Sequence, residues 1–562
     1  MTETVPTVAE GVTSAVRYRA VAFLPLVALH CMGAVATPAA DPPRLTVVLV
    51  VDQMRADFLE RYAPLFEGGF ARILADGAVF TDAAQDHAAT VTAVGHATIS
   101  TGVFPARHGI VGNDVFDHEA GEAVYSAFDP AAPILGLPDA PGRSPVRIRR
   151  SGLADWLKAA NPESRVFSTA LKDRSAIMMG GRDPDGVYWY HDAAEGIVTS
   201  TFYTAEVPDW VEAFAFRDRV ASYFSRGWDR LLPREAYDGV SREDRFEAEG
   251  RGWPSEFPHR FAEIFPDGTA ESPGHDYFDD FTDTPFADEV ILQFARAAVE
   301  QEGLGADDTP DLLFIGASAA DYIGHRWGPY SQEVQDYYMR LDRYLGELFE
   351  ALDDRVGVDE WALVLSSDHG VAPAPEELLR RGEHARRISA DEYSREIRAA
   401  IGAAFEETGI DPVPTVRWLD GPHLISETAS PEELRELRRV LADRFAEIDF
   451  VAAAFTSDEV AGADPGADGM LGRFRRSYYE GRSPDVMLLL EPNHIVGGVT
   501  ATHGSAHWYD RQVPLVFMGP GIPAGRYDGP VRTVDIAPTL ARLLGIPAPA
   551  DLDGRTLTQI VP

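Results

Sequence analysis

The chain has 562 residues, of which 45% are hydrophobic and 10% aromatic, the composition of a globular protein with a sizeable core. Its formal net charge of −39 excludes binding to nucleic acid or to an anionic membrane surface through bulk charge. The same charge repels an anionic substrate at long range, so a site for one needs locally placed cations or metal ions.

The N-terminus has the pattern of an export signal. Arg17 and Arg19 precede an apolar stretch, Ala20–Val35, which ends on an A-x-A cleavage sequence. We therefore predict a signal peptide over 1–36, a periplasmic or secreted protein, and no membrane span in the mature chain. Cys31, the only cysteine, lies inside this segment, and lipid attachment there is the alternative interpretation.

The first part of the mature chain alternates strand and helix signals, which is typical of an α/β fold. The apolar pattern predicts strands over 45–52 and 166–171 and helices over 54–76 and 152–160. Residues 183–285 differ, because they hold many aromatic side chains and scattered acids without a clear period. This region is predicted to be an inserted cap or a long functional loop region.

The second part contains further core elements and another insertion. We predict a helix over 287–303, a strand over 311–317 and a helix over 330–352. Within 375–482, two helical patterns and two short apolar runs suggest a small α/β subdomain. The subdomain has predicted helices near 390–406 and 432–446 and apolar runs at 413–418 and 450–455. After it, we predict core strands at 486–490 and 513–518 and a closing helix at 534–544.

These elements predict an α/β fold with a mostly parallel central sheet sandwiched by helices. The catalytic core is assigned to three segments, 43–182, 286–374 and 483–562. The cap region, 183–285, and the small α/β subdomain, 375–482, are assigned as insertions into that core.

Acidic and histidine side chains follow three of the predicted strands. Asp52 ends the first strand, Asp321 and His325 follow the strand at 311–317, and the pair 368–369 follows a run at 361–367. Each residue alone is typical of a helix cap or a structural histidine. Because active sites form at the carboxyl edge of such sheets, we expect them to meet there. With His503, the set is three carboxylates, Asp52, Asp321 and Asp368, and three imidazoles, His325, His369 and His503, which suits a two-metal site of the kind that binds Zn²⁺.

Two threonines lie in a small-residue segment around Gly95 that is able to start a helix. One interpretation is simple N-capping by Thr90 or Thr92. The other is a threonine nucleophile, whose hydroxyl needs activation by a metal ion or a base. A bound Zn²⁺ makes a neighbouring histidine base unnecessary.

Lys172 and Arg174 form a cationic pair after the predicted strand at 166–171. The chain has only two lysines, the other being Lys158, so a lysine at this place stands out. On an extended segment, residues two apart point to one face, and two cations there are able to hold phosphate oxygens. The alternative is a solvated strand end.

At these residues the chain resembles the alkaline phosphatase superfamily and, within it, the PafA-like phosphate monoesterases that use a threonine nucleophile. The resemblance covers nearly the whole mature chain, in the order of the family's motifs. The motifs are residues 50–55, 90–96, 108–114, 172–174, 321–325, 367–370 and 502–505.

The resemblance implies two Zn²⁺ ions per chain. One ion, held by Asp52, Asp368 and His369, also binds the nucleophile. The second ion faces the leaving group and is held by Asp321, His325 and His503. His507, four residues after His503, is the alternative ligand.

Thr92 is the implied nucleophile, since the family uses the second threonine of its Thr-x-Thr pair. Asn113, Lys172 and Arg174 are implied to contact the phosphoryl oxygens. The sequence departs from the family in one respect, because proline often precedes the Thr-x-Thr pair and the Gly-His pair. Those positions hold Ala89 and Val94 here, which leaves the loop less rigid and removes no reacting group.

The function implied is that of an exported zinc-dependent alkaline phosphatase, which hydrolyses small-molecule phosphate monoesters through a covalent phospho-threonine. A phosphodiesterase or nucleotide pyrophosphatase of the same superfamily is the first alternative. The second is a non-catalytic periplasmic protein that binds zinc or phosphate. A sulfatase is disfavoured because no cysteine follows residue 31, and a lipid-headgroup transferase because further membrane spans are missing from the sequence.

Overall fold

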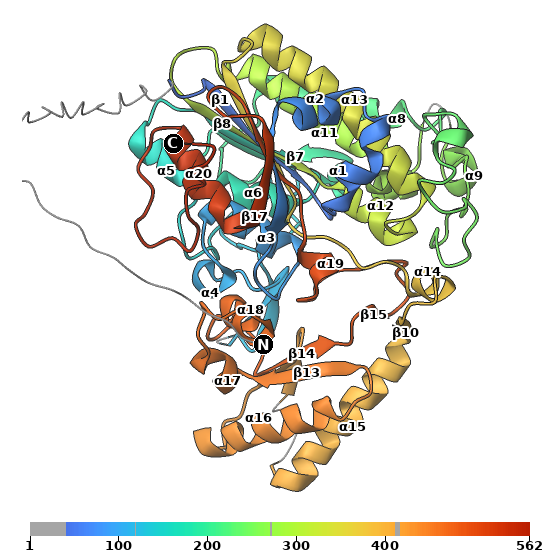
Figure 1. Cartoon of the computed structure of the whole chain (residues 1–562), viewed down its shortest axis with the longest axis vertical. Coiled ribbons are helices and arrows are strands. Elements are labelled where there is room, and N and C mark those ends of the chain that lie inside the picture. Colours follow the sequence, from blue (N-terminus) through green and yellow to red (C-terminus); the bar gives the residue numbers. More distant parts are fainter. Residues whose placement is uncertain (1–40, 119, 270–271, 411–415, 562) are drawn as a thin grey trace, which may run out of the picture. The chain divides into compact units, whose positions relative to one another are not determined.

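The computed structural model describes residues 41–118, 120–269, 272–410 and 416–561 (Figure 1). The predicted signal peptide, 1–36, lies outside the described residues. The described residues, 41–118, 120–269, 272–410 and 416–561, belong to one compact unit of the chain. None of the helices within these ranges combines the length and the apolar character that crossing a membrane requires.

Within the described residues, a nine-stranded mixed sheet forms the centre of the fold. Five adjacent strands in its middle run parallel, while one strand towards one edge and the last strand at the other are antiparallel to their neighbours. This confirms the predicted α/β class. In spatial order the strands are β17 (Gly525–Arg532), β2 (Ala78–Ala84), β16 (Leu515–Met518), β9 (Trp361–Ser366), β1 (Leu45–Val51), β8 (Asp311–Ala317), β5 (Val166–Ala170), β6 (Gly186–His191) and β7 (Gly196–Val198).

Helices cover both faces of the sheet because its central strands are apolar on both sides. In β1, Val47 and Leu49 pack into one hydrophobic cluster, and Val48 and Val50 pack into another on the opposite face. Each such buried side chain contributes roughly 1.5–3 kcal/mol. The first cluster includes α2 (Gly69–Asp76), α11 (Pro285–Gln301) and α13 (Gln332–Arg355), and the second includes α5 (Leu153–Ala160) and α20 (Ile536–Leu543).

The single helix predicted over 54–76 is wrong. The structure has α1 (Asp57–Tyr62), a 3₁₀ turn over Ala63–Leu65, and then α2. Pro64 lies in the 3₁₀ turn and has no backbone N–H, and the glycine pair that follows weakens helical continuity. The periodic apolar pattern runs through both helices and hides the break between them.

The aromatic-rich region predicted as a cap begins by extending the central sheet with β6 and β7. Its later part consists of short helices joined by loops, with Trp228 fully buried against Trp327. The short helices are α7 (Asp209–Ala213), α8 (Phe216–Ala221), α9 (Phe261–Ile264) and α10 (His275–Asp280).

The residues predicted as a small subdomain contain an antiparallel strand pair covered by two helices (Figure 1). The pair is β13 (Val451–Thr456) and β14 (Val486–Leu490), and the helices are α15 (Ala390–Thr408) and α16 (Pro431–Ala446). The assignment of 486–490 to the core sheet is therefore wrong. The run is apolar on both faces, with Val486 against the helices and Leu489 in a cluster with Ala88 on the other side, and such a run resembles a central strand. The outer domain boundaries stay a prediction.

The remaining helices and strands are short. They are α3 (Thr92–Thr101), α4 (Pro105–His108), β3 (Asp114–Asp117), β4 (Glu122–Tyr125), α6 (Asp173–Gly180), α12 (Ala319–Trp327), α14 (Pro375–Arg380), β10 (Arg386–Ile388), β11 (Val416–Trp418), β12 (Pro422–Leu424), α17 (Ser457–Gly462), α18 (Met470–Ser477), β15 (His494–Val496) and α19 (Trp508–Arg511).

Candidate active site

Four neighbouring parallel strands, β9, β1, β8 and β5, end at the same edge of the sheet. The register pairs Val51 with Ala317, Val50 with Ser366, and Ala170 with Gly316. The residues just beyond these ends therefore lie close together, as is usual for the carboxyl edge of a parallel sheet. They are Asp52 after β1, Asp368 after β9, Asp321 after β8 and Lys172 after β5.

Asp52, Asp368 and His369 form the first candidate metal group, and all three are fully buried. Nε2 of His369 lies 3.4 Å from Oδ1 of Asp52 and 3.3 Å from Oδ2 of Asp368. These three atoms make no hydrogen bond within the described part of the chain. Buried polar atoms without partners are costly, so three of them facing one point indicate a ligand that the protein is built to hold.

Asp321, His325 and His503 form the second group. Asp321 and His325 lie one turn apart on α12, as predicted, with Oδ1 and Nε2 3.2 Å apart. His503 comes from the loop before α19, and its Nε2 lies 3.4 Å from the same carboxylate oxygen. Helix α12 and the loop before α19, which are far apart in the sequence, therefore meet at the carboxylate of Asp321.

All three imidazoles are held through their other ring nitrogen. In each case Nδ1 lies 2.8–3.0 Å from a backbone carbonyl oxygen, to which it donates its proton. This fixes the tautomer and leaves the Nε2 lone pair facing the group, the arrangement usual for histidine ligands. The carbonyls belong to Ala501 for His325, Thr90 for His503 and Gly370 for His369.

The spacing and charge of both groups fit Zn²⁺. Tetrahedral ligands at about 2.0–2.1 Å from zinc stand about 3.3–3.4 Å from one another, close to the separations measured here. Burial and the neighbouring Asp52 raise the pKa of Asp368 well above its usual range, so this carboxylate needs a cation beside it to stay ionised. Burial and His503 lower the pKa of His369, which keeps the imidazole neutral, as a ligand must be.

Thr92 is the first residue of α3 and is buried. Its hydroxyl lies 3.4 Å from Nζ of Lys172. The helix approaches the end of β9 closely, because a Cβ on Gly95 would lie 2.3 Å from the carbonyl oxygen of Asp368. Thr90, by contrast, donates its hydroxyl proton to the carbonyl oxygen of Ser505, so its side chain is already engaged.

Asn113 and the first turn of α3 are joined by a hydrogen bond. The backbone N–H of Ala93 donates to Oδ1 of Asn113 over 3.0 Å. The carboxamide oxygen of Asn113 thus accepts a hydrogen bond beside Thr92, and its NH₂ group remains available as a donor. The side chain is thereby placed next to the candidate nucleophile.

The extended geometry predicted for Lys172 and Arg174 is wrong. Lys172 has extended backbone angles, but α6 begins at Asp173, so Arg174 lies in the first turn of a helix. An acidic residue in the first turn favours this helix start. Nζ of Lys172 is nevertheless 2.7 Å from Asp52 and 2.6 Å from Asp321, and therefore contacts one carboxylate of each metal group.

Arg174 lies against Tyr125 from the β3–β4 hairpin. Its Nη1 donates a long hydrogen bond of 3.5 Å to the tyrosine oxygen, while its Nε has no partner among the described residues. Tyr125 in turn donates to Asp173, which Arg143 contacts over 2.6 Å. The guanidinium is held beside Lys172 with hydrogen-bonding capacity left unused.

The sequence matches the type I phosphodiesterase/nucleotide pyrophosphatase family over residues 46–502. The chain belongs to this family, and with it to the alkaline phosphatase superfamily. It is therefore a hydrolase of that superfamily.

The chain is similar to alkaline phosphatases along nearly its whole length. It is 32% identical to alkaline phosphatase PafA of Elizabethkingia meningoseptica, over 95% of this chain and 98% of that protein. It is 34% identical to alkaline phosphatase PhoK of a Sphingomonas species, over 93% of this chain and 92% of that protein. The crystal structure of wild-type PafA covers 93% of this chain and all of its own chain, with a TM-score of 0.85 and 31% identity.

Gln53 connects the two candidate metal groups, a role that is not predicted from the sequence. Its backbone N–H donates to Asp368 over 3.1 Å, and its side-chain amide donates to Asp321. Its φ of 62° is a strained conformation for a residue other than glycine, and such strain concentrates at functional sites. A polar residue directly after Asp52 was the only signal for it in the sequence.

His507, the alternative ligand, lies apart from both groups. Its Nε2 faces neither group and lies 2.8 Å from the carbonyl oxygen of Leu490, to which it donates a hydrogen bond.

His96 is a further residue beside the site that is not predicted from the sequence. Its Nδ1 is 2.9 Å from the carbonyl oxygen of Thr92, and burial lowers its pKa to about 4.

Gly324→Ala should weaken metal binding without unfolding the protein. A Cβ at this position would lie 1.8 Å from Oε1 of Gln53, so the side chain must leave Asp321. Loss of an outer hydrogen bond of this kind lowers metal affinity by about 10–100-fold, whereas alanine itself favours a helix. Titration with a competing chelator measures the affinity, and thermal unfolding measures the stability. Gln53→Ala should give the same loss, and the double variant no further loss; additive losses would contradict the role of Gln53.

Proposed function

We propose that this protein is an exported two-zinc alkaline phosphatase, which hydrolyses phosphate monoesters through a covalent phospho-threonine at Thr92. The observation that carries the proposal is the position of Lys172. Its ammonium group contacts Asp52 and Asp321 and lies 3.4 Å from the hydroxyl of Thr92. Lys172 therefore brings together the proposed nucleophile and one carboxylate of each candidate metal group. This arrangement is suited to binding a phosphoryl group.

The two residue groups would each hold one zinc ion. The ion beside Thr92 would be held by Asp52, Asp368 and His369. The ion on the leaving-group side would be held by Asp321, His325 and His503. When bound, zinc supplies Lewis-acid stabilisation of oxygens and lowers the pKa of hydroxyl groups that bind it.

Thr92 acts as the nucleophile in the first step. Its oxygen, having lost the hydroxyl proton, forms a bond to phosphorus as the bond to the ester oxygen breaks, and the departing oxygen takes up a proton and leaves as the alcohol. Water then hydrolyses the phospho-threonine, releases phosphate and restores the hydroxyl. The buried position of Thr92 excludes bulk water from the first step.

Asn113, Lys172 and Arg174 bind the oxygens of the transferred phosphoryl group. Phosphoryl transfer gains most of its rate from positioning and from charge stabilisation at these oxygens. A monoester dianion has one more charged oxygen than a diester, and two cations serve that oxygen. The pair therefore favours a monoesterase over a phosphodiesterase, although both occur in this family's superfamily.

A matched set of esters tests the proposal. The purified protein is stripped with a chelator, reloaded with Zn²⁺, and assayed on an aryl phosphate, its methyl diester and the corresponding aryl sulfate. We expect the chelated protein to be inactive and the reloaded protein to prefer the monoester by at least about a hundredfold, since two charge-assisted contacts are involved.

Metal analysis of the same samples should give about two zinc ions per chain, the number that the mechanism uses. Preference for the diester would favour the phosphodiesterase alternative. Tight zinc binding without turnover of any ester would favour the binding-protein alternative. Full activity with one zinc ion per chain would contradict the two-metal site.

A further inference from the structure

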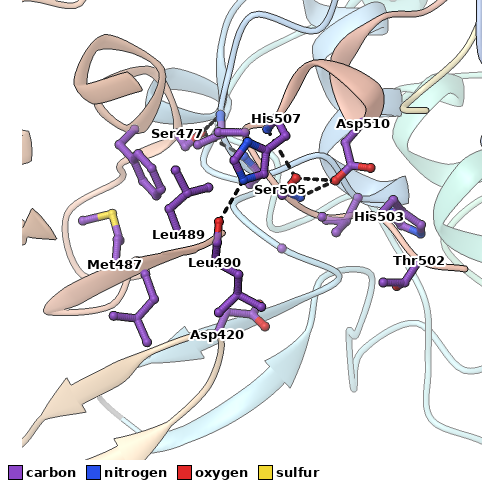
Figure 2. Close-up of a pocket in the computed structure, with 18 of the residues that line it drawn as sticks. Asp420, Ser477, Met487, Leu489, Leu490, Thr502, His503, Ser505, His507 and Asp510 are labelled. Atoms are coloured by element: carbon purple, nitrogen blue, oxygen red, sulfur yellow. Dashed lines mark hydrogen bonds between the residues drawn. The ribbon is translucent and has the colours of Figure 1, made fainter. Parts of the chain in front are cut away.

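A cavity of about 450 Å³ adjoins the candidate site on the side of His503. Figure 2 shows His503 and Thr502 on one side of this cavity and Met487 and Leu489 from β14 on the other. Val91, the residue before Thr92, lines it as well. The cavity thus reaches both the loop of the proposed nucleophile and a proposed ligand on the leaving-group side.

One wall of the cavity is apolar. Met487 and Leu489 face it from the strand pair, and Phe474 and Ala88 belong to the same hydrophobic cluster. Binding cavities of 300–1,000 Å³ with predominantly apolar walls are typical of small-molecule sites. This wall is suited to the carbon skeleton of an organic alcohol.

Two carboxylates that line the cavity form no ion pair in the described part of the chain. Asp114 and Asp420 both line it, and neither side chain makes an ion pair or a hydrogen bond within the described residues. Both side chains are exposed, and partial loss of water and the charge of Asp114 together raise the pKa of Asp420. Burial and Asp420 also raise the pKa of Tyr393, on the same wall, to about 12. The end of the cavity at Asp420 is therefore negative.

Three other ionisable side chains of the cavity make contacts within the protein. Nη1 of Arg482 donates to the carbonyl oxygens of Gly109 and Arg147. Oδ2 of Asp510 accepts the hydroxyl proton of Ser505 over 2.5 Å, while its Oδ1 has no partner among the described residues. His507 is bound to a backbone carbonyl, and burial lowers its pKa, so it is neutral. Asp114 and Asp420 differ from these groups, because their carboxylates make no ion pair or hydrogen bond at all within the described residues.

We propose that this cavity receives the leaving alcohol of the phosphate monoester, and that it selects alcohols that combine an apolar carbon skeleton with a cationic group. The inference rests on the proposed function, because it places the leaving group on the side of His503. It predicts poor use of leaving groups that carry further phosphates or carboxylates. The net charge of −39 disfavours such substrates as well.

Three aryl phosphates of nearly equal size test the charge preference. They carry an aminomethyl, a hydroxymethyl or a carboxymethyl group in the para position, and the methylene keeps the leaving-group reactivity similar. Methyl phosphate, whose alcohol is too small to fill the cavity, is the reference for each enzyme variant. We expect kcat/KM, relative to methyl phosphate, to be about tenfold higher for the cationic than for the anionic substrate, because a partly exposed ion pair contributes a few-fold per charge.

Asp420→Asn removes one charge and suits the backbone, since Asp420 has a φ of 54° and asparagine tolerates this region. We expect it to reduce the ratio between the cationic and the anionic substrate at least threefold. Glu406→Gln is the matched control, because it removes one exposed charge from α15 away from the cavity. It should leave the ratio unchanged.

The outcomes separate the two proposals. If neither the wild type nor either variant hydrolyses methyl phosphate or the aryl monoesters, the proposed function fails. If the wild type hydrolyses them with no charge preference, or if Asp420→Asn and Glu406→Gln change the ratio equally, the leaving-group cavity is wrong and the proposed function stands. A preference for the carboxymethyl substrate would also overturn the inference.

Discussion

Thr92→Ala is expected to lower kcat for phosphate monoesters by at least about a thousandfold, since loss of a covalent nucleophile removes most of the catalytic advantage. The hydroxyl of Thr92 is buried beside Lys172, which contacts one carboxylate of each candidate metal group. Steady-state kinetics on zinc-loaded protein measure the loss. Zinc content and thermal unfolding, measured on the same sample, show whether the site and the fold survive.

Thr90→Ala is the matched control for this variant. Thr90 has the same side chain two residues away, and its hydroxyl donates to the carbonyl oxygen of Ser505 rather than facing Lys172. We expect it to lose about one hydrogen bond of stability, roughly 0.5–1.5 kcal/mol, and to keep most of its activity. An inactive Thr90→Ala beside an active Thr92→Ala would show that the nucleophile is assigned to the wrong threonine.

The double variant Lys172→Ala/Arg174→Ala is expected to lose at least about a hundredfold in kcat/KM for monoesters. Each charge-assisted contact to the phosphoryl group is worth about 1.5–3 kcal/mol, and every 1.36 kcal/mol is a factor of ten. Diesterase activity should fall much less, because a diester has a neutral ester group in place of the additional charged oxygen. The ratio of the two activities should therefore shift towards diesters.

Lys158→Ala provides the control for removing a lysine. Lys158 binds Asp185 and the carbonyl oxygen of Ser164 at the other end of β5, away from the site. It should change neither activity. Because Lys172 also contacts Asp52 and Asp321, the zinc content of the double variant must be measured alongside its kinetics. Equal losses on monoester and diester at full zinc content would contradict a role for the pair in monoester specificity.

The sequence predicts the parts of this site that depend on strand ends. Apolar runs such as 45–51 and 311–317 are buried on both faces, so their bounds are visible in the sequence, and Asp52 and Asp321 follow within four residues of the strand ends. The four-residue spacing of Asp321 and His325 is that of a helical turn, which the structure confirms. The side chains that share an edge of the sheet could be expected to meet before the fold was known.

Features that depend on tertiary contacts could not be predicted in this way. Gln53 joins the metal groups only because β1, β8 and β9 are neighbours, and because Gly324 leaves room for its amide. The helix start at Asp173 competes with an extended strand end, and local sequence does not decide between them. The run at 486–490 is apolar on both faces for a different reason, since its second face packs against residues such as Ala88 rather than within the central sheet.

Trapping the covalent intermediate tests the central claim most directly. The zinc-loaded protein is mixed with excess monoester, quenched in acid during turnover, digested and examined by mass spectrometry for a phosphorylated peptide. We expect phosphate on Thr92, none on Thr90, and no trapped phosphate in Thr92→Ala. Phosphate on another residue, or full turnover under conditions that should trap a phospho-enzyme with none detected, would contradict a threonine nucleophile at this site.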